Sequence, residues 1–358
     1  MANSVEEGIP ALHKYQSVKY YPFEVEPGCS LVLSSDPWSY VYAYLKNRSV
    51  GSRGKNRACL NRAVYFSELA ADFYRASADT SLPTKGMLSY YGMLNLAKAF
   101  LSEQGVELEK DWEHHGLSIP LGKGKAVTVK KISSGISIFQ DFSRALGKPV
   151  TGEETYPIKD LFVHIPEIHE ICFSLGFLPW AKRKYLPISI HYLVNSGKNK
   201  VFTEMRYEKR NEERVDTSRF YKGAREQYFK QLIAQDSSIR FRSKARKPVD
   251  GKNWPRIYRN INNEYAQFNI VSLLTREGYK HYCDLRPGPF HHMAYMLAIM
   301  FYIGSVARYR PTETEELLQS EFRPIISEST ETLPNQFLYQ MVSYITKSVC
   351  VIPQASLK

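Results

Sequence analysis

Apolar residues recur with helical spacing in two neighbouring stretches of the chain. From Cys59 to Phe73 they are separated by steps of four, three, four and three residues, which places them on one helical face. From Tyr90 to Leu101 a similar spacing follows a break at Pro83. Because the link between the two stretches is short, we expect two helices that pack antiparallel as a hairpin.

The segment before this hairpin contains a helix start and a polar run. Asp36-Pro37-Trp38 predicts the start of a helix, with Asp36 as the cap and Pro37 in the first turn. The run 47–55 holds several Ser and Gly residues and shows no periodicity, so we expect a loop there.

The pattern changes to β-type runs in the middle of the chain and returns to helices at its end. Runs rich in β-branched and aromatic residues predict strands over 186–194, 200–207, 267–274 and 278–285. Helical patterns cover 158–175, a basic stretch at 217–235, the long apolar stretch 290–308, and 313–320 and 335–349. Within 158–175 we expect a helix to begin at Pro166.

This order of elements predicts an α+β fold that is mainly α. We expect the early and late helices to form one bundle, with a central basic, β-containing insertion. Four segments follow: strands, a turn and a short helix over 1–55, the first helical hairpin over 56–135, a mixed and basic middle region over 136–285, and the C-terminal helices over 286–358.

Several classes of protein are disfavoured by composition. The longest apolar stretch, Met293 to Val306, is too short to span a bilayer, and the first ten residues lack a secretory pattern, so we expect a cytoplasmic protein without membrane contact. The five cysteines are far apart and form no Cys-x-x-Cys pair, which predicts reduced thiols and neither a metal nor a cofactor. The Walker spacing and the Gly-x-Ser-x-Gly elbow are both absent.

Positive charge is concentrated in the middle of the chain. The segment 198–259 holds 18 Lys or Arg against 8 Asp or Glu, and thus carries +10 of the formal net charge of +12. Aromatic residues are interleaved with these cations, a combination typical of surfaces that bind single-stranded nucleic acid. The predicted contact residues are Arg240, Arg242, Lys244, Arg246, Lys247 and Trp254. A solvated basic face is the alternative interpretation.

Two further arginines end the long apolar helix. Arg308 and Arg310 could reach a phosphate, or they could serve only to offset the negative end of the helix dipole. We include both among the predicted nucleic-acid contacts. His114 and His115 are weaker candidates, because no matching ligand cluster accompanies them and a turn with satisfied imidazoles is the simpler interpretation.

The stretch Arg286-Pro-Gly-Pro-Phe-His291-His292 lies at the N-terminal end of the predicted long apolar helix. The Pro-Gly-Pro turn is stiff, so Arg286 can fold back toward His291 in the first helical turn. A guanidinium beside an imidazole at a helix N-terminus can bind a phosphate and transfer a proton near neutral pH. A capping or packing role for His291 is the alternative.

Four pieces of the sequence resemble the bacterial YaaC-like family. They are Asp36-Pro37-Trp38, Leu88-Ser-Tyr-Tyr-Gly-Met-Leu-Asn-Leu-Ala-Lys-Ala-Phe100, His115-Gly116-Leu117 and Val306-Ala-Arg-Tyr-Arg-Pro311. The resemblance covers most of the chain and implies a bacterial cytoplasmic protein.

A more distant resemblance is to HEPN domains, whose helical bundles carry an Arg, four to six residues and then a His near the last long helix. Arg286 and His291 match this spacing. The resemblance implies metal-independent cleavage of RNA across a dimer interface, with His291 as acid or base on the 2′-hydroxyl and Arg286 on the scissile phosphate. Many HEPN domains are inactive and bind only nucleotides or partners, so the resemblance also allows that role.

Three functions therefore remain open. The first is an RNA-binding protein with metal-independent endoribonuclease activity, a homodimer acting as a bacterial defence or toxin-type effector. The second is a non-catalytic module that binds nucleic acid. The third is a protein-interaction subunit of a bacterial defence complex, whose basic segment docks an acidic partner.

Overall fold

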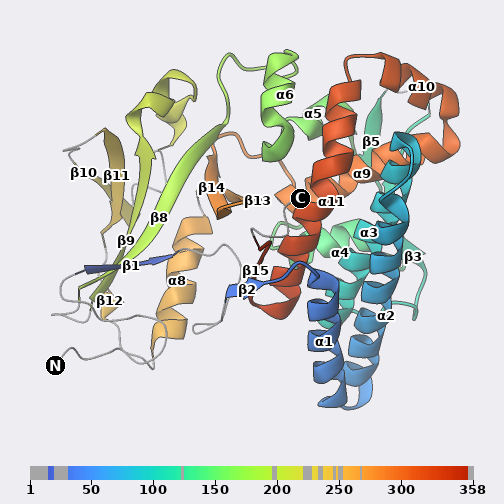
Figure 1. The fold of residues 1–358 in the computed structure, drawn as a ribbon, viewed down its shortest axis with the longest axis horizontal. Coiled ribbons are helices and arrows are strands. Elements are labelled where there is room, and N and C mark those ends of the chain that lie inside the picture. Colours follow the sequence, from blue (N-terminus) through green and yellow to red (C-terminus); the bar gives the residue numbers. More distant parts are fainter. Residues whose placement is uncertain are drawn as a thin grey trace. The chain divides into compact units, whose positions relative to one another are not determined.

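The computed structural model describes residues 15–19, 31–121, 125–195, 200–220, 228–232, 237–244, 247–248, 253–266 and 268–353 (Figure 1). The chain divides into two compact units, each made of discontinuous segments. Unit 1 comprises Met1–Leu33, Trp180–Pro287 and Lys347–Lys358, and unit 2 comprises Ser34–Pro179 and Gly288–Thr346. The fold is α+β and mainly α, as the order of elements predicts.

Unit 2 is built on helices from both ends of its sequence. They are α1 (Pro37–Val50), α2 (Gly54–Ser77), α3 (Leu82–Glu103), α9 (His292–Tyr309), α10 (Pro311–Gln319) and α11 (Arg323–Thr346). The predicted cap is confirmed, since Oδ1 of Asp36 accepts a hydrogen bond of 3.2 Å from the backbone N–H of Ser39. The predicted hairpin is also present as α2 and α3. The loop expected over 47–55 is shorter, because α1 continues to Val50 and α2 begins at Gly54.

Glycines allow α3 and α9 to approach closely. A Cβ at Gly86 would lie 2.6 Å from Cγ2 of Ile303, and a Cβ at Gly304 would lie 3.1 Å from Cα of Met87. Both distances are shorter than ordinary van der Waals contact, so only glycine fits the present helix spacing. The apolar stretch predicted as a core helix is α9, and its residues from His292 to Gly304 are all buried.

The last long helix differs from its predicted bounds. The sequence places a helix start after Pro334, but α11 runs from Arg323 through Pro334 to Thr346. Apolar residues buried on both sides of the proline, such as Leu333 and Phe337, hold the helix in place at that point. Burial thus compensates for the backbone hydrogen bond that a proline removes.

Short elements complete unit 2. They are β3 (Glu113–His114), β4 (Leu117–Ser118), β5 (Ala126–Val129), β6 (Ile136–Ser137), α4 (Ile138–Ala145), β7 (Glu154–Pro157), α5 (Ile158–Phe162), η1 (Pro166–Ile168) and α6 (His169–Ser174). The helical pattern over 158–175 is thus divided, and helical structure begins again at Pro166, where the sequence predicts a helix start. The segment is broken because Ile165, before Pro166, is extended, as a residue that precedes proline prefers to be.

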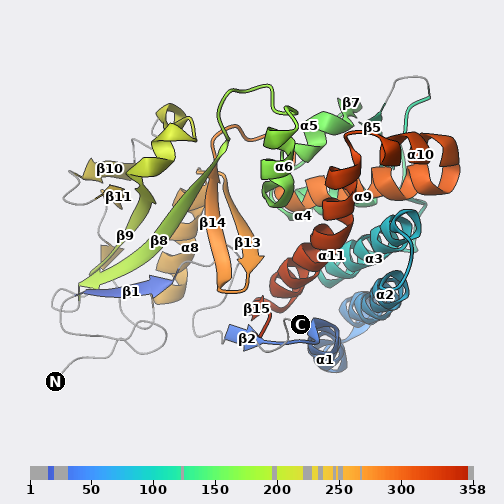
Figure 2. The ribbon, with the colours of Figure 1, turned by 45° about the horizontal axis from the view of Figure 1, so that its top comes forward.

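Unit 1 contains an antiparallel sheet in the order β10-β11-β9-β8-β14-β13, with β1 paired to β8 (Figure 2). The short strand β12 pairs with β9. The strands are β1 (Tyr15–Lys19), β8 (Tyr185–Asn195), β9 (Lys200–Glu208), β10 (Phe229–Leu232), β11 (Ser238–Ser243), β12 (Lys247–Pro248), β13 (Ile270–Thr275) and β14 (Gly278–Asp284). The unit also holds η2 (Lys209–Glu213), η3 (Thr217–Arg219), α8 (Trp254–Ala266) and a parallel pair of β2 (Leu31–Leu33) with β15 (Val349–Val351).

One face of this sheet packs against α8. Alternate residues of β8, from Leu186 to Tyr192, share a buried cluster with Trp254, Ile261 and Tyr265 of the helix. Because strand residues alternate between faces, the residues between them lie on the opposite face. This alternation decides where the charged residues of the basic segment lie.

The basic helix predicted over 217–235 is wrong in its described part. Residues 217–219 form a single 3-10 turn, and Phe229–Leu232 form the strand β10. Phe229 is fully buried in the cluster beside α8, and pairing with β11 supplies the backbone hydrogen bonds. Tertiary pairing therefore overrides the helical pattern.

The described residues contain neither a membrane-spanning helix nor a metal-binding cluster. No helix in that part of the chain is long and apolar enough to cross a membrane. The same residues hold no group of three or more His, Cys, Asp or Glu side chains arranged to bind a metal ion. Of the cysteines, Cys59, Cys172, Cys283 and Cys350 are buried and no disulfide joins them to one another, and Cys29 lies outside the described residues.

Candidate functional site

Four cationic side chains of unit 1 lie together on the sheet face opposite α8. Lys230 of β10 is directly opposite Arg242 of β11, and Arg240 of β11 is directly opposite Arg206 of β9. Their strand neighbours Phe229, Phe241 and Met205 are in the buried cluster, so these cations lie on the other face. We call Arg206, Lys230, Arg240 and Arg242 the basic strand face.

A buried carboxylate lies within this face. Glu204 has no exposed side-chain surface, and its two oxygens accept hydrogen bonds from Arg206 Nε at 2.6 Å and Arg242 Nη2 at 2.8 Å. Burial raises the pKa of Glu204, but the hydrogen bonds and charges of the two arginines outweigh that effect and lower it overall. The carboxylate is therefore ionised, and the basic strand face keeps an excess of positive charge.

Other predicted contacts of the basic segment lie in different settings. Lys244 directly follows β11 and is exposed, whereas Nζ of Lys247 pairs with Glu264 of α8 at 2.6 Å. Arg246 lies outside the described residues. Trp254 is only 2% exposed and packs its ring against Tyr192 and Tyr258. The Trp254 ring is thus a core contact in this structure, because the period of α8 turns it toward the sheet.

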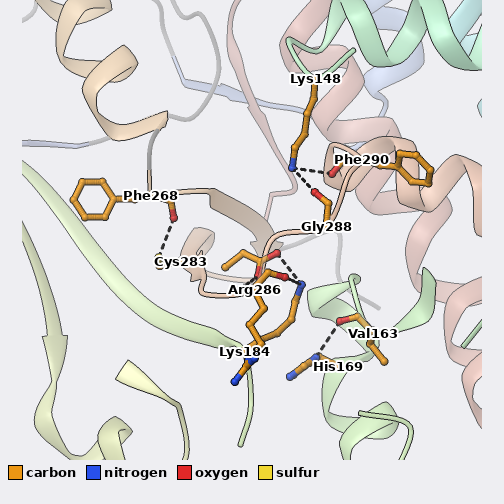
Figure 3. Close-up of polar contacts among 10 residues, drawn as sticks. Lys148, Val163, His169, Lys184, Phe268, Cys283, Arg286, Gly288 and Phe290 are labelled. Carbon is orange, nitrogen blue, oxygen red and sulfur yellow. Dashed lines mark hydrogen bonds and ion pairs between the residues drawn. The ribbon is translucent and has the colours of Figure 1, made fainter. Parts of the chain in front are cut away.

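Arg286 belongs to unit 1 and has partners there. Its Nη2 lies 3.3 Å from Oδ2 of Asp216, and its guanidinium stands 5.0 Å from the centre of the Trp180 ring. Its backbone oxygen accepts a hydrogen bond of 3.1 Å from Nζ of the fully buried Lys184, which also pairs with Asp284 at 2.8 Å (Figure 3). These contacts hold both the side chain and the backbone oxygen of Arg286 in place.

His291 belongs to unit 2 and caps α9. Its Nδ1 accepts a hydrogen bond of 3.3 Å from the backbone N–H of Met293, and the helix begins at His292, two residues after the predicted start at 290. Burial, followed by the charge of Lys148, lowers the pKa of His291 to about 4. Nζ of Lys148 donates to the backbone oxygens of Gly288 at 2.8 Å and Phe290 at 3.3 Å (Figure 3). Arg286 and His291 therefore fall in different units, and each has partners in its own.

Unit 2 also contains a cavity of about 740 Å³ that sequence reasoning did not predict. It lies between α3, the β3–β4 turn and the C-terminal end of α9. Its lining includes Tyr90, Tyr91, His115, Arg308 and Tyr309. Three of the pieces on which the YaaC-like resemblance rests, 88–100, 115–117 and 306–311, contribute to this lining. We call it the unit 2 pocket.

His115 is held in this pocket by Tyr90. The hydroxyl of the buried Tyr90 lies 2.5 Å from Nδ1 of His115, and the two rings are 5.9 Å apart. Burial lowers the pKa of His115, and the positive charges of Lys98 and Arg308 lower it further. Burial also raises the pKa of Tyr90 well above its ordinary value. At neutral pH both groups are therefore uncharged.

The two arginines at the end of α9 have different partners. Arg310 pairs with Glu313 at 3.1 Å and donates to the backbone oxygens of Ile119 and Pro120 at 3.4 and 3.2 Å, so it fixes the loop beside the pocket. Arg308 is exposed, donates to the hydroxyl of Tyr91 and stands 4.9 Å from the centre of the Tyr309 ring. No carboxylate of the described ranges pairs with Arg308. Of the two predicted phosphate contacts, Arg308 is the one whose charge remains unpaired within those ranges.

Comparison with known proteins gives one match. The sequence model of a family described as YaaC-like Protein matches residues 32–345. No curated protein and no solved structure matches the chain.

Proposed function

The chain belongs to the YaaC-like family, and we propose that it binds RNA through the basic strand face of unit 1. The observation that carries the proposal is the pairing of like charges across strands, Lys230 with Arg242 and Arg240 with Arg206. Like charges directly opposite each other destabilise a sheet. Glu204 offsets part of that repulsion through its bonds to Arg206 and Arg242, and an external polyanion would relieve the rest.

The local charge balance supports a polyanion as the ligand. Glu204 lies beneath Arg206 and Arg242, with its side chain fully buried, so it holds them in place and leaves parts of both exposed, 35% and 29% of their side chains. Among the described residues, Glu208 also shares this face and pairs with Arg210, so four cations lie against two carboxylates and the face keeps a net positive charge. Such a face attracts phosphates by releasing their counterions.

The residues of the basic strand face also determine whether it can distinguish one RNA sequence from another. Phe202 is the aromatic residue on β9 that shares this face, and it is 3% exposed beneath Arg242, 4.8 Å from that guanidinium. The contact is therefore mainly electrostatic, with little reading of base identity and a steep dependence on salt. We name RNA rather than DNA because the resemblance to ribonuclease domains implies it, and a DNA oligonucleotide of the same sequence is the comparison.

Fluorescence anisotropy with a labelled single-stranded RNA tests this proposal. The double variant K230E/R240E reverses two charges of the face and keeps the Glu204 hydrogen bonds to Arg206 and Arg242. The control K46E/R57E changes the net charge by the same amount at exposed positions of α1 and α2. We expect K230E/R240E to weaken binding at least tenfold and to reduce the salt slope, with the control close to the parent. Equal affinities of the two double variants would refute the proposal.

The other expectations remain predictions. Metal-independent cleavage by Arg286 and His291, a homodimer, a role in defence and a protein partner are implied by the resemblance. Cleavage is the one that can be examined directly, and its assay is given below.

A further inference from the structure

The unit 2 pocket combines three features of a ligand site. It is a cavity of about 740 Å³, a size that accommodates a small organic ligand. It contains a cation, Arg308, that pairs with no carboxylate of the described ranges. It also contains an imidazole, His115, whose Nδ1 is already engaged by Tyr90.

The contact with Tyr90 decides which nitrogen of His115 carries the proton. A buried hydroxyl that fails to donate a hydrogen bond costs free energy, and Nδ1 of His115 is the acceptor within reach of the Tyr90 hydroxyl. Tyr90 therefore donates and Nδ1 accepts. The proton of the neutral ring is then on Nε2, which has no partner in the part of the chain that the structure describes. His115 thus offers one N–H donor on a residue that lines the pocket.

The other charged groups of the pocket are already paired. The lining carboxylate Glu113 pairs with Lys98, which is not a lining residue, at 2.7 Å, and the lining Arg310 pairs with Glu313 at 3.1 Å. Lys130 lies 3.5 Å from Glu153 and is half-exposed. Two lining groups then remain as hydrogen-bond donors for a ligand, the guanidinium of Arg308 and Nε2–H of His115. Both suit an anionic ligand. A guanidinium beside a neutral imidazole donor is well matched to phosphate oxygens.

We propose that the unit 2 pocket binds a phosphate monoester, with Arg308 and Nε2–H of His115 as donors to the phosphate and Tyr90 as the residue that positions His115. The exposed Tyr309 ring, 66% accessible at the lining, provides a surface on which a nucleobase can stack. The ligand is then either a free nucleotide or the phosphorylated end of an RNA. This site lies in unit 2 and is independent of the basic strand face.

Calorimetry with adenosine monophosphate and adenosine tests the site. The two probes share the base and sugar, and only the first carries a phosphate. We expect the monophosphate to bind at least tenfold more tightly and this preference to vanish in R308Q, while R57Q, which alters an exposed arginine of α2, keeps it. Equal affinity for the two probes, or an R308Q variant that retains the preference, would overturn the proposal, as would the absence of binding by both the monophosphate and a 5′-phosphorylated RNA.

The source of the phosphate is decided in the K230E/R240E background, where binding through the basic strand face is weakened. If a short 5′-phosphorylated RNA binds at least tenfold more tightly than adenosine monophosphate, and the same RNA with a 5′-hydroxyl does not, the ligand is an RNA end. If the mononucleotide binds as tightly as that RNA, the ligand is a free nucleotide. Both outcomes support the phosphate site, and neither depends on whether unit 1 binds RNA.

The positioning role of Tyr90 has its own readout. Nitrogen-15 NMR of the histidine side chains distinguishes the two neutral tautomers, and we expect His115 to be protonated on Nε2 in the parent. Y90F removes the hydroxyl and should yield a mixture of tautomers, with weaker phosphate binding. A parent ring protonated on Nδ1 would overturn this part of the proposal.

Discussion

The hydroxyl of Tyr90 lies 2.5 Å from Nδ1 of His115, and this contact joins the middle of α3 to the β3–β4 turn. The charge state of His115 also depends on Arg308, since the positive charge of that guanidinium lowers the imidazole pKa, after burial and Lys98. We therefore expect R308Q to raise the pKa of His115. An NMR pH titration of the ring should show the rise, with R57Q as a control that leaves the midpoint unchanged. No rise in R308Q would mean that Arg308 exerts no charge effect on the imidazole.

A second prediction concerns a buried carboxyl group. Both carboxyl oxygens of Glu167 are buried and have no hydrogen-bond partner within the described residues, and burial raises the pKa of this group to about 8. The folded protein therefore keeps Glu167 protonated at a pH where the unfolded chain ionises it. The stability it contributes is complete below the ordinary pKa of glutamate, and it is lost as the pH rises through 8.

The variant E167Q should remove that loss, because its amide cannot ionise. Between pH 5 and 8 the parent should lose free energy of unfolding relative to E167Q, with a slope of at most roughly 1.4 kcal/mol per pH unit. Urea unfolding across this pH range measures it. E316Q, at an exposed position of α10, is the control that should follow the parent. Parallel curves for the parent and E167Q would contradict the assignment.

The contact of α3 with α9 gives a prediction on stability. G86A would place a Cβ 2.6 Å from Ile303 Cγ2, so the helices must separate or the isoleucine must change rotamer. We expect a loss of about 1–3 kcal/mol in the free energy of unfolding. G51A is the matched control, since its Cβ would meet backbone oxygens only at 3.7 Å and the residue has φ of −75°. If G86A is as stable as G51A, the close approach of the two helices is not required.

Cleavage of RNA in EDTA examines the predicted catalytic pair. The ribonuclease resemblance implies products with 2′,3′-cyclic phosphate ends that form without metal. H291N removes the imidazole while asparagine retains the ability to cap α9, so its loss of activity would not reflect a missing cap. R286Q is the companion variant. We expect both to lose cleavage while circular dichroism stays that of the parent, and cleavage at the parent rate by either variant would show that its residue is not catalytic.

The periodic apolar segments could be predicted from the sequence, since the hairpin α2–α3, the core helix α9 and the strands β8 and β9 follow local patterns. The strand β10 could not, because Phe229 is buried against Tyr265 and Phe268, which come more than thirty residues later in the chain. The helix α8 is absent from the predicted elements, although the spacing of Trp254, Ile261 and Tyr265 carries a helical signal at the end of the basic segment and just beyond it.

Of the two candidate sites, one could be predicted in part from the sequence and the other could not. Arg240 and Arg242 could be predicted from the density of positive charge, and their alternation along a strand places both on one face. The unit 2 pocket could not be predicted, because Tyr91 and Arg308 are 217 residues apart in the chain and meet only in the folded unit. Local patterns contain no information about such a distant contact.

The division of unit 2 into two sequence segments has a consequence for its synthesis. Residues 180–287 of unit 1 lie between those segments, so the ribosome completes α3 long before it makes α9. During that interval the apolar face of α3 that α9 later covers lacks its final partner, and contacts between such distant segments form slowly. We therefore expect the nascent chain to be more prone to aggregation before the second segment emerges than after it.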